Sequence, residues 1–405
     1  MDTAVTDQGG VAVFKKNVNL TGGVFILNMG RRRYMEFLLT QDTEIEISVD
    51  TLDLLGKTIF VGSQENTIYY DFLKKKAFND YQMIHLNQKI KSGKYSVDSV
   101  RIFKNLVALY QKQEVQNKER IVASKSGTFL AHLLKTGIIP EIPGGMRDSD
   151  KGVWMKKHFF DNVDFKDGRL AYSPVFIDLY KSYVSLFGVP DIGHVVEAVD
   201  FIIEKSKVDS VNYKWTLYFL TSTFERSAAR GQDIVFVHLV EKYYKKETCW
   251  WLAEEQMRRM TDRSAILKHL FIGAECVDFK ARDSSGAEIH LHQQIDKVTV
   301  LFFWNYDCKH CVQEGPVLAE WIKRHSEFKL ITACVGPDVE KWKEKLREFG
   351  WPGCHLIDEE GEANFIQNYG INHTPEYFVI GKDKKIRAKY IASTKALESF
   401  LKEGK

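Results

Sequence analysis

Two cysteines separated by two residues, Cys308 and Cys311, form the most chemically informative pattern in the chain. They follow an uncharged run from Val298 to Phe303 that is rich in β-branched and aromatic residues, which is typical of a strand buried on both faces of a sheet. A helical pattern then begins at the first cysteine. The second cysteine lies nearly one helical turn further on, close enough to form a disulfide, so the spacing predicts a redox-active dithiol.

The expected position of Cys308 favours its thiolate. At a helix N-terminus, unpaired backbone N–H groups and the positive end of the helix dipole stabilise a negative charge. Because the thiolate is the reactive form of cysteine, we expect Cys308 to be the nucleophile. Two other readings stay open: a pair of unreactive structural thiols, and half of a zinc site. Zinc is disfavoured because the sequence has no second Cys-x-x-Cys and no His-x-x-x-His pair.

The composition is that of an ordinary globular protein. Of the 405 residues, 44% are apolar and 27% are charged, and this length predicts roughly two to four domains. The formal net charge of +3 is small, which suggests neither nucleic acid nor an anionic membrane as a partner. No apolar run is long enough for a transmembrane helix. The first ten residues lack the apolar core of a signal peptide, so we expect either a cytoplasmic protein or a chain whose export signal is missing.

The two regions before the dithiol are expected to support or present it. Alternation of polar and apolar residues, clearest at 44–49, predicts a small antiparallel β domain over residues 1–62. From 63 to 270 the apolar spacing becomes helical and predicts a mainly α-helical domain. Its many aromatic residues are more typical of a core than of a carbohydrate or peptide platform. The helical region shows no paired carboxylates, nucleophile elbow or phosphate loop.

Residues 271–405 are predicted to form an α/β domain. After a hairpin around residues 283–286, strands alternate with helices, and the chain ends with a second hairpin and a helix. This order predicts a mixed central sheet with flanking helices. The remaining cysteines are expected to be small buried apolar side chains, namely Cys249, Cys276, Cys334 and Cys354.

The C-terminal region resembles the thioredoxin superfamily, and within it the TlpA/ResA-like branch often labelled AhpC/TSA. The resemblance rests on four motifs in this order: Phe303-Trp304, Cys308-Lys309-His310-Cys311, Pro316 and Thr374-Pro375. It implies an α/β thioredoxin fold and a thiol-disulfide oxidoreductase of the reductase or isomerase type. In that resemblance Cys308 is the attacking thiol and Cys311 the resolving thiol.

The same resemblance implies a substrate-binding surface. Pro375 would be a cis-proline facing the dithiol, and the backbone of Thr374 would pair with an extended substrate segment. Trp304 would belong to this surface as well. His373 would lie on its rim or be an ordinary loop residue.

Other residues would tune the thiols. The buried acid of thioredoxin corresponds to Phe302 here, so Glu314, one turn after Cys311, is expected to replace it as the base. The alternative for Glu314 is a solvated helix residue. Lys309 and His310 would stabilise the thiolate and make the dithiol more oxidising, although Asp307 would oppose them.

The resemblance implies no cofactor and no metal beyond the redox-active disulfide Cys308–Cys311. Its partners would be proteins that carry thiols or disulfides, together with an upstream thiol electron donor. Peroxidase activity is disfavoured, because Leu301 and Asn305 occupy the positions where a peroxiredoxin needs proline and threonine. The main alternative is an interaction module, in which the helical domain binds an envelope protein or glycan and the dithiol is not catalytic.

The regions upstream resemble DUF4369-type and DUF5106-type segments, which precede thioredoxin-like domains in exported Bacteroidetes proteins. The second resemblance rests on the stretches at 159–165 and 167–172. It implies a periplasmic or cell-envelope location. Together with the few strands predicted in residues 1–62, it leads us to expect that the native N-terminus is truncated here.

Overall fold

The computed structural model describes residues 2–15, 21–30, 32–40, 44–186, 191–225, 231–359 and 361–403. They form two compact units, Met1–Val189 with Glu197–Thr216, and Pro190–Val196 with Leu217–Lys405. The second unit therefore groups the last helices before residue 270 with the C-terminal region. The domain boundaries expected at 62/63 and 270/271 stay predictions.

The first unit begins with two antiparallel strand pairs. They join β1 (Gly23–Asn28) to β2 (Tyr34–Leu39) and β3 (Glu46–Ser48) to β4 (Ile59–Val61). The small antiparallel β unit predicted from the alternating pattern is thus confirmed.

Helices follow, and a side chain caps the start of each of the first three. Ser63, Ser96 and Thr128 accept hydrogen bonds from backbone N–H groups in the first turns of the next three helices. The helices between residues 63 and 270 are α1 (Gln64–Lys91), α2 (Val97–Ser124), α3 (Phe129–Thr136), α4 (Asp148–His158), α5 (Pro174–Leu186), α6 (Ile192–Ser206), α7 (Ser210–Glu225), α8 (Gln232–Tyr243) and α9 (Glu254–Lys268), with a 3₁₀ turn, η1 (Gly168–Tyr172). The expected mainly helical middle region is confirmed.

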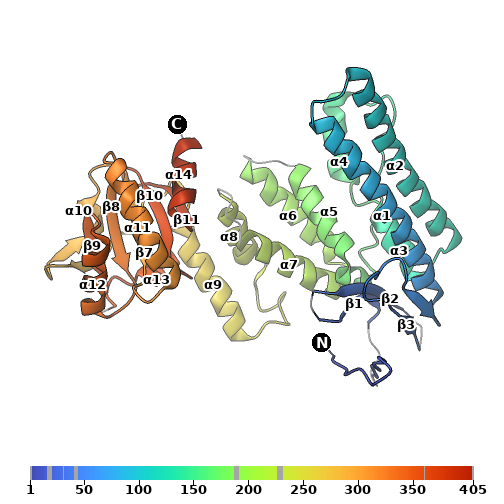
Figure 1. The fold of residues 1–405 in the computed structure, drawn as a ribbon, viewed down its shortest axis with the longest axis horizontal. Helices are drawn as coiled ribbons and strands as arrows, with labels where there is room; N and C mark the ends of the chain where they lie inside the picture. Colours follow the sequence, from blue (N-terminus) through green and yellow to red (C-terminus); the bar gives the residue numbers. More distant parts are fainter. Residues whose placement is uncertain are drawn as a thin grey trace. The chain divides into compact units, whose positions relative to one another are not determined.

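A seven-stranded mixed sheet forms the centre of the C-terminal part (Figure 1). Its order is β11-β10-β7-β8-β9-β5-β6, and β7, β8 and β9 are parallel. The strands are β5 (Lys280–Asp283), β6 (Glu288–His290), β7 (Thr299–Trp304), β8 (Lys329–Cys334), β9 (Cys354–Ile357), β10 (Glu376–Ile380) and β11 (Ile386–Ile391).

Helices cover both faces of this sheet and divide its core in two. The helices are α10 (Leu291–Gln294), α11 (Lys309–Arg324), α12 (Val339–Phe349), α13 (Phe365–Tyr369) and α14 (Thr394–Glu403). On one face, Phe302 of β7 packs in a cluster with residues of α11, α12 and α14. On the other, Phe303 packs with α13 and with Leu270. Because β7 is buried on both sides, the fold places its carboxyl end, and the dithiol after it, at a fixed point.

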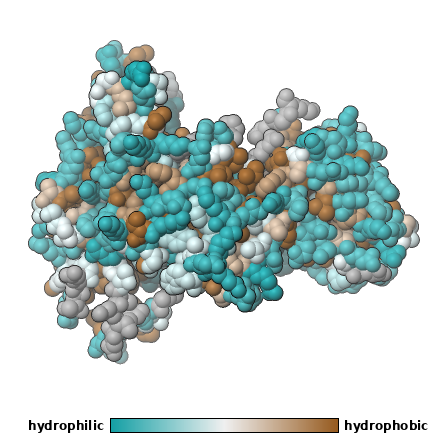
Figure 2. Space-filling view, turned by 180° about the vertical axis from the view of Figure 1, so that it is seen from behind, coloured by the Kyte–Doolittle hydropathy of each residue, from teal (hydrophilic) through white to brown (hydrophobic). Residues whose placement is uncertain are grey.

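Hydrophilic residues predominate on the face shown in Figure 2, and the apolar ones are interspersed among them. Within the described ranges, no helix combines the length and apolar character that crossing a bilayer would require.

Candidate active site

Cys308 is the N-cap of α11, as the sequence predicts. Its Sγ accepts a hydrogen bond from the backbone N–H of Cys311 at 3.4 Å. The Cys308 thiol also donates to the carbonyl oxygen of Thr374 at 3.2 Å. Cys308 is partly buried, whereas Cys311 is fully buried, and both thiols are free. The site therefore presents one accessible sulfur in front of one inaccessible sulfur.

The surroundings move the two thiol pKa values in opposite directions. Burial acts to raise the pKa of Cys308, but hydrogen bonds with Cys311 and Thr374 and from the backbone N–H groups of Cys311 and His310 outweigh it, so the net pKa is lowered. Burial, followed by the hydrogen bond with Cys308, raises the pKa of Cys311 to about 12. In such an asymmetric pair, the thiol with the lowered pKa is the nucleophile, and the thiol with the raised pKa stays protonated until a later step.

We expect iodoacetamide to alkylate Cys308 far faster than Cys311 in the reduced protein at neutral pH. A lowered pKa keeps the Cys308 thiolate present below the ordinary thiol range, and its reactivity should fall only as the pH drops through that pKa. Cys311, with a pKa of about 12, should stay protonated and unreactive. Peptide mass spectrometry across a pH series measures both rates, with Cys354, whose pKa burial raises, as the internal reference. Equal rates at Cys308 and Cys311 would contradict the asymmetry.

The loop before β10 faces the dithiol. The Thr374–Pro375 peptide bond is cis, as expected, and Pro375 is buried while Thr374 is partly exposed. His373 is exposed, and its Nδ1 lies 3.0 Å from Oε1 of Glu376. The structure thus brings Thr374 against Cys308 and leaves His373 on an exposed stretch of the same loop.

The structure places Trp304 differently from the expected substrate surface. Its side chain is fully buried at the end of β7. The ring packs against Phe349 and Trp351, with centroids 6.1 and 4.9 Å away. A side chain enclosed in the core cannot contact a protein substrate, so Trp304 supports the dithiol from inside because it ends the strand that carries it.

Lys309 and His310 are both exposed in the first turn of α11. The group of His310 that lowers the Cys308 pKa is its backbone N–H, not its imidazole. The stabilisation expected from charged side chains between the cysteines is therefore provided by the helix backbone.

Glu314 has partners other than the expected Cys311. Its Oε2 accepts hydrogen bonds from the backbone N–H and the hydroxyl of Thr394, at 2.8 and 2.7 Å, and from the hydroxyl of Tyr377 at 3.3 Å. Thr394 is the first residue of α14, so the carboxylate occupies the N-terminus of that helix. This geometry corrects the expectation of a direct base and makes Glu314 a link between α11 and α14.

Two substitutions of Glu314 separate these roles. Glu314→Gln can still accept the Thr394 bonds, so we expect release of a mixed disulfide to stay within about threefold of wild type, whereas loss of a base costs about 100-fold or more. Glu314→Ala loses the cap and should lower the free energy of unfolding by about 1 kcal/mol. Gln313→Ala, one position earlier on α11, is the exposed control. If Glu314→Gln released the mixed disulfide about 100-fold more slowly than wild type, Glu314 would be the base for Cys311 after all.

Glu376 is a site residue that sequence analysis missed. It follows Pro375 directly, is only 2% exposed, and burial raises its pKa to about 8. It lies opposite Phe303 in the β10–β7 pairing, hence on the face of the sheet away from Cys311. The signal was available, because a lone acid opens an otherwise uncharged strand, Glu376–Ile380.

The other cysteines behave largely as predicted. Cys249, Cys276 and Cys334 are buried, and Cys354 is partly buried. Among the residues that the structure describes, no cluster of three or more His, Cys, Asp or Glu side chains could hold a metal ion.

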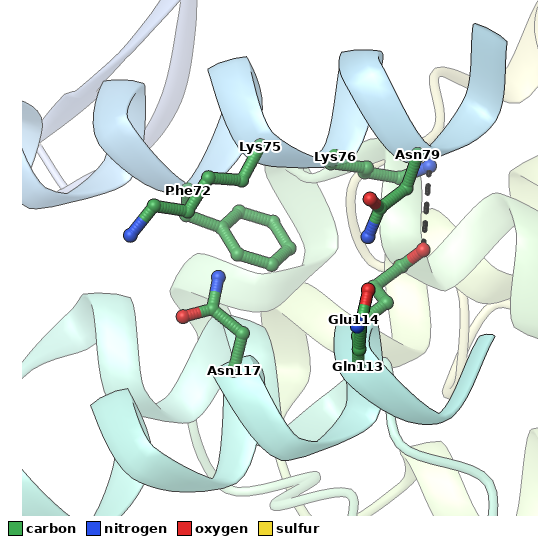
Figure 3. Close-up of a pocket in the computed structure, with 7 residues that line it drawn as sticks. All are labelled: Phe72, Lys75, Lys76, Asn79, Gln113, Glu114 and Asn117. Atoms are coloured by element: carbon green, nitrogen blue, oxygen red, sulfur yellow. Dashed lines mark ion pairs between the residues drawn. The ribbon is translucent and has the colours of Figure 1, made fainter. Parts of the chain in front are cut away.

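A pocket lies in the first unit, which does not include the dithiol, between α1 and α2 (Figure 3). Its volume is about 270 Å³, and its lining includes Phe72 and Lys76 from α1 and Glu114 from α2. Lys76 Nζ lies 4.0 Å from Glu114 across the gap and 2.6 Å from Asp80. Lys76 thus pairs with Glu114 across the gap, as charged side chains of two neighbouring amphipathic helices commonly do.

Comparison with known proteins identifies two regions of the chain. Residues 272–389 match the AhpC/TSA family, and residues 108–268 match a domain of unknown function, DUF5106. No curated protein matches the chain.

Solved structures with similar folds include three of interest. A thioredoxin-like protein from Bacteroides caccae is 19% identical with a TM-score of 0.53, over 66% of this chain and 98% of that one. A domain of a possible thiol-disulfide isomerase from Cytophaga hutchinsonii is 30% identical with a TM-score of 0.30, over 33% of this chain and 93% of that one. A thiol-disulfide oxidoreductase from Bacteroides fragilis is 19% identical with a TM-score of 0.30, over 32% and 99%. By the two family matches and the fold shared with the first of these structures, the chain has a thioredoxin-like domain of the AhpC/TSA family, preceded by a DUF5106 domain.

Proposed function

We propose that this protein is a thiol-disulfide oxidoreductase that exchanges disulfides with envelope proteins through Cys308 and Cys311. The observation that carries the proposal is the asymmetry of the pair. Cys308 caps a helix, is partly exposed and has a lowered pKa, whereas Cys311 directly behind it is buried with a raised pKa. A structural thiol pair would need neither the exposure nor the opposite pKa shifts.

In the reducing direction the Cys308 thiolate attacks one sulfur of a protein disulfide. The substrate S–S bond breaks, the leaving sulfur takes up a proton, and a mixed disulfide with Cys308 forms. Cys311 then loses its proton and attacks Cys308 Sγ, which releases the second substrate sulfur and closes the Cys308–Cys311 disulfide. The second released sulfur also takes up a proton. The substrate gains two electrons from the protein and two protons, one equal to the proton that Cys308 gave to the solvent on forming its thiolate and one from Cys311. An upstream thiol donor would return the electrons and the protons, with no further cofactor.

The loop at Pro375 would hold the substrate during this exchange. Thr374 is partly exposed beside Cys308, so an extended segment that pairs with its backbone would bring a disulfide to the Cys308 sulfur. The envelope setting of the proposal rests on the resemblance to exported proteins, and fractionation of the cells that make this chain tests it separately.

The deciding experiment is the equilibrium redox potential of the dithiol, measured by alkylation in glutathione and dithiothreitol buffers. Known proteins range from about −120 mV for a strong oxidant to about −270 mV for thioredoxin. A value near the reducing end makes this protein a reductase, and one near the oxidising end points to disulfide formation or isomerisation. A dithiol that fails to cycle would overturn the proposal and favour an interaction module. Rapid peroxide consumption by the reduced protein would instead indicate a peroxidase.

A further inference from the structure

The last helix of the DUF5106 region packs on the thioredoxin-like domain, beside β11 (Figure 1). Leu270, just after α9, belongs to the core cluster on one face of the sheet, and Ile266 of α9 packs against that cluster. The preceding helix, α8, is joined to β11 by an ion pair between Asp233 and Lys389 at 2.6 Å, in which both side chains are largely buried. These contacts fix α8 and α9 at the β11 edge of the sheet. The redox site follows β7 of the same sheet.

Arg263 on α9 contacts the start of the loop that ends at Pro375. Its Nη1 donates a hydrogen bond to the carbonyl oxygen of Gly370 at 2.8 Å, and its guanidinium lies over the Tyr390 ring, 5.7 Å from the centroid. Gly370 has a φ of +62°, and a Cβ there would lie 2.5 Å from Arg263 Nη1. Gly370 is the C-cap of α13 in the left-handed conformation, which favours glycine, so the loop begins with a glycine to which the arginine binds.

Glu376 closes the other end of the same loop on the same face of the sheet. One of its carboxylate oxygens, Oε1, pairs with His373. The other, Oε2, is buried, as is Nε of Arg263, and neither atom has a hydrogen-bond partner among the described residues. The Arg263 charge acts against burial on the Glu376 pKa, so the guanidinium is within electrostatic reach of both ends of the loop.

We propose that Arg263 is a positioning residue for the substrate-binding loop, so that the DUF5106 domain supplies a part of the redox site. By donating to the Gly370 carbonyl and acting electrostatically on Glu376, it holds the two ends of the segment 370–376. The middle of that segment carries Thr374, whose carbonyl oxygen lies 3.2 Å from the Cys308 sulfur. This inference rests on the proposed function, because a positioned loop matters only if it receives a substrate.

The loop holds a protein substrate, whereas a small alkylating agent needs only the Cys308 thiolate. Loss of Arg263 should therefore impair the two reactions differently. For Arg263→Met we expect kcat/KM for insulin reduction to fall about tenfold, mainly through KM, because one hydrogen bond from a charged group is lost. The rate of iodoacetamide alkylation at Cys308 should stay within about twofold of wild type. Arg263→Lys keeps the charge and a donor and should recover most of the loss.

The matched control is Arg259→Met on the same helix, because Arg259 is exposed and its ion pair among the described residues is a local one with Glu255. Unchanged insulin kinetics in Arg263→Met, an equal loss in Arg259→Met, or a parallel loss of alkylation would overturn the proposal. If wild type itself fails to reduce insulin, the reducing direction of the proposed function fails, and amide hydrogen exchange at residues 371–374 then decides the positioning role. Faster exchange there in Arg263→Met than in Arg259→Met supports it, and equal exchange rejects it.

Discussion

Cys308→Ser is expected to lower the rate of protein disulfide reduction by at least about a thousandfold, because a serine hydroxyl provides no thiolate at neutral pH. The fold should be unaffected. Cys308 is the partly exposed N-cap of α11, and serine is among the residues that prefer this position. Turnover of insulin by the full chain with dithiothreitol measures the rate, and thermal unfolding checks the fold.

Cys354→Ser is the matched control for this variant. Cys354 is a partly buried cysteine on β9, and nothing in the proposed reaction uses it. It should reduce insulin at the wild-type rate. A Cys308→Ser protein that kept much of its activity would show that the reacting sulfur lies elsewhere in the chain.

Local sequence patterns were sufficient for the core of the site. The uncharged run before Trp304 predicted a strand buried on both faces, and β7 is fully buried. The onset of helical periodicity predicted Cys308 at a helix N-terminus, where it is the N-cap of α11. Both features depend on residues close together in the chain, and short-range periodicity reports on these directly.

Features set by distant residues escaped prediction. A partner of Glu314 is Thr394, 80 positions away, and nothing around α11 shows that a second helix begins there. The Arg263 contact with Gly370 spans 107 positions. Trp304 was misassigned for a related reason, since its burial depends on Phe349 and Trp351 from a later part of the chain. Side-chain roles fixed by tertiary packing are invisible to periodicity.

The position of Glu376 separates two ways in which an acid can serve a dithiol. An acid on the Cys311 face could accept the Cys311 proton directly, but β10 directs Tyr377 to that face and Glu376 to the opposite one. Glu376 therefore acts on the loop rather than on the sulfur. Burial, followed by the hydrogen bond with Cys308, raises the pKa of Cys311 to about 12 in the reduced protein. Since no acid is bonded to this thiol among the described residues, its attack on the mixed disulfide relies on proximity.

Cys311→Ser should therefore stop the reaction at the mixed disulfide. The wild-type thiol needs only to lose its proton beside Cys308, and removal of such an internal nucleophile should slow product release by at least about a thousandfold. Insulin mixed with the reduced variant should give a covalent adduct on non-reducing electrophoresis that dithiothreitol removes. Peptide mass spectrometry should place the bond at Cys308, and the double variant Cys308→Ser/Cys311→Ser should form no adduct.

An adduct through Cys354, or none at all, would contradict the assignment of roles. The direction of the result follows from access rather than from pKa alone. Cys311 is fully buried, so an incoming disulfide meets Cys308 first, and only a sulfur already inside the protein can reach Cys308 from behind. Serine at position 311 fills nearly the same space as cysteine, but its hydroxyl cannot break the sulfur–sulfur bond of the mixed disulfide. The trapped state therefore shows that attack by Cys308 on the substrate precedes attack by Cys311 on Cys308.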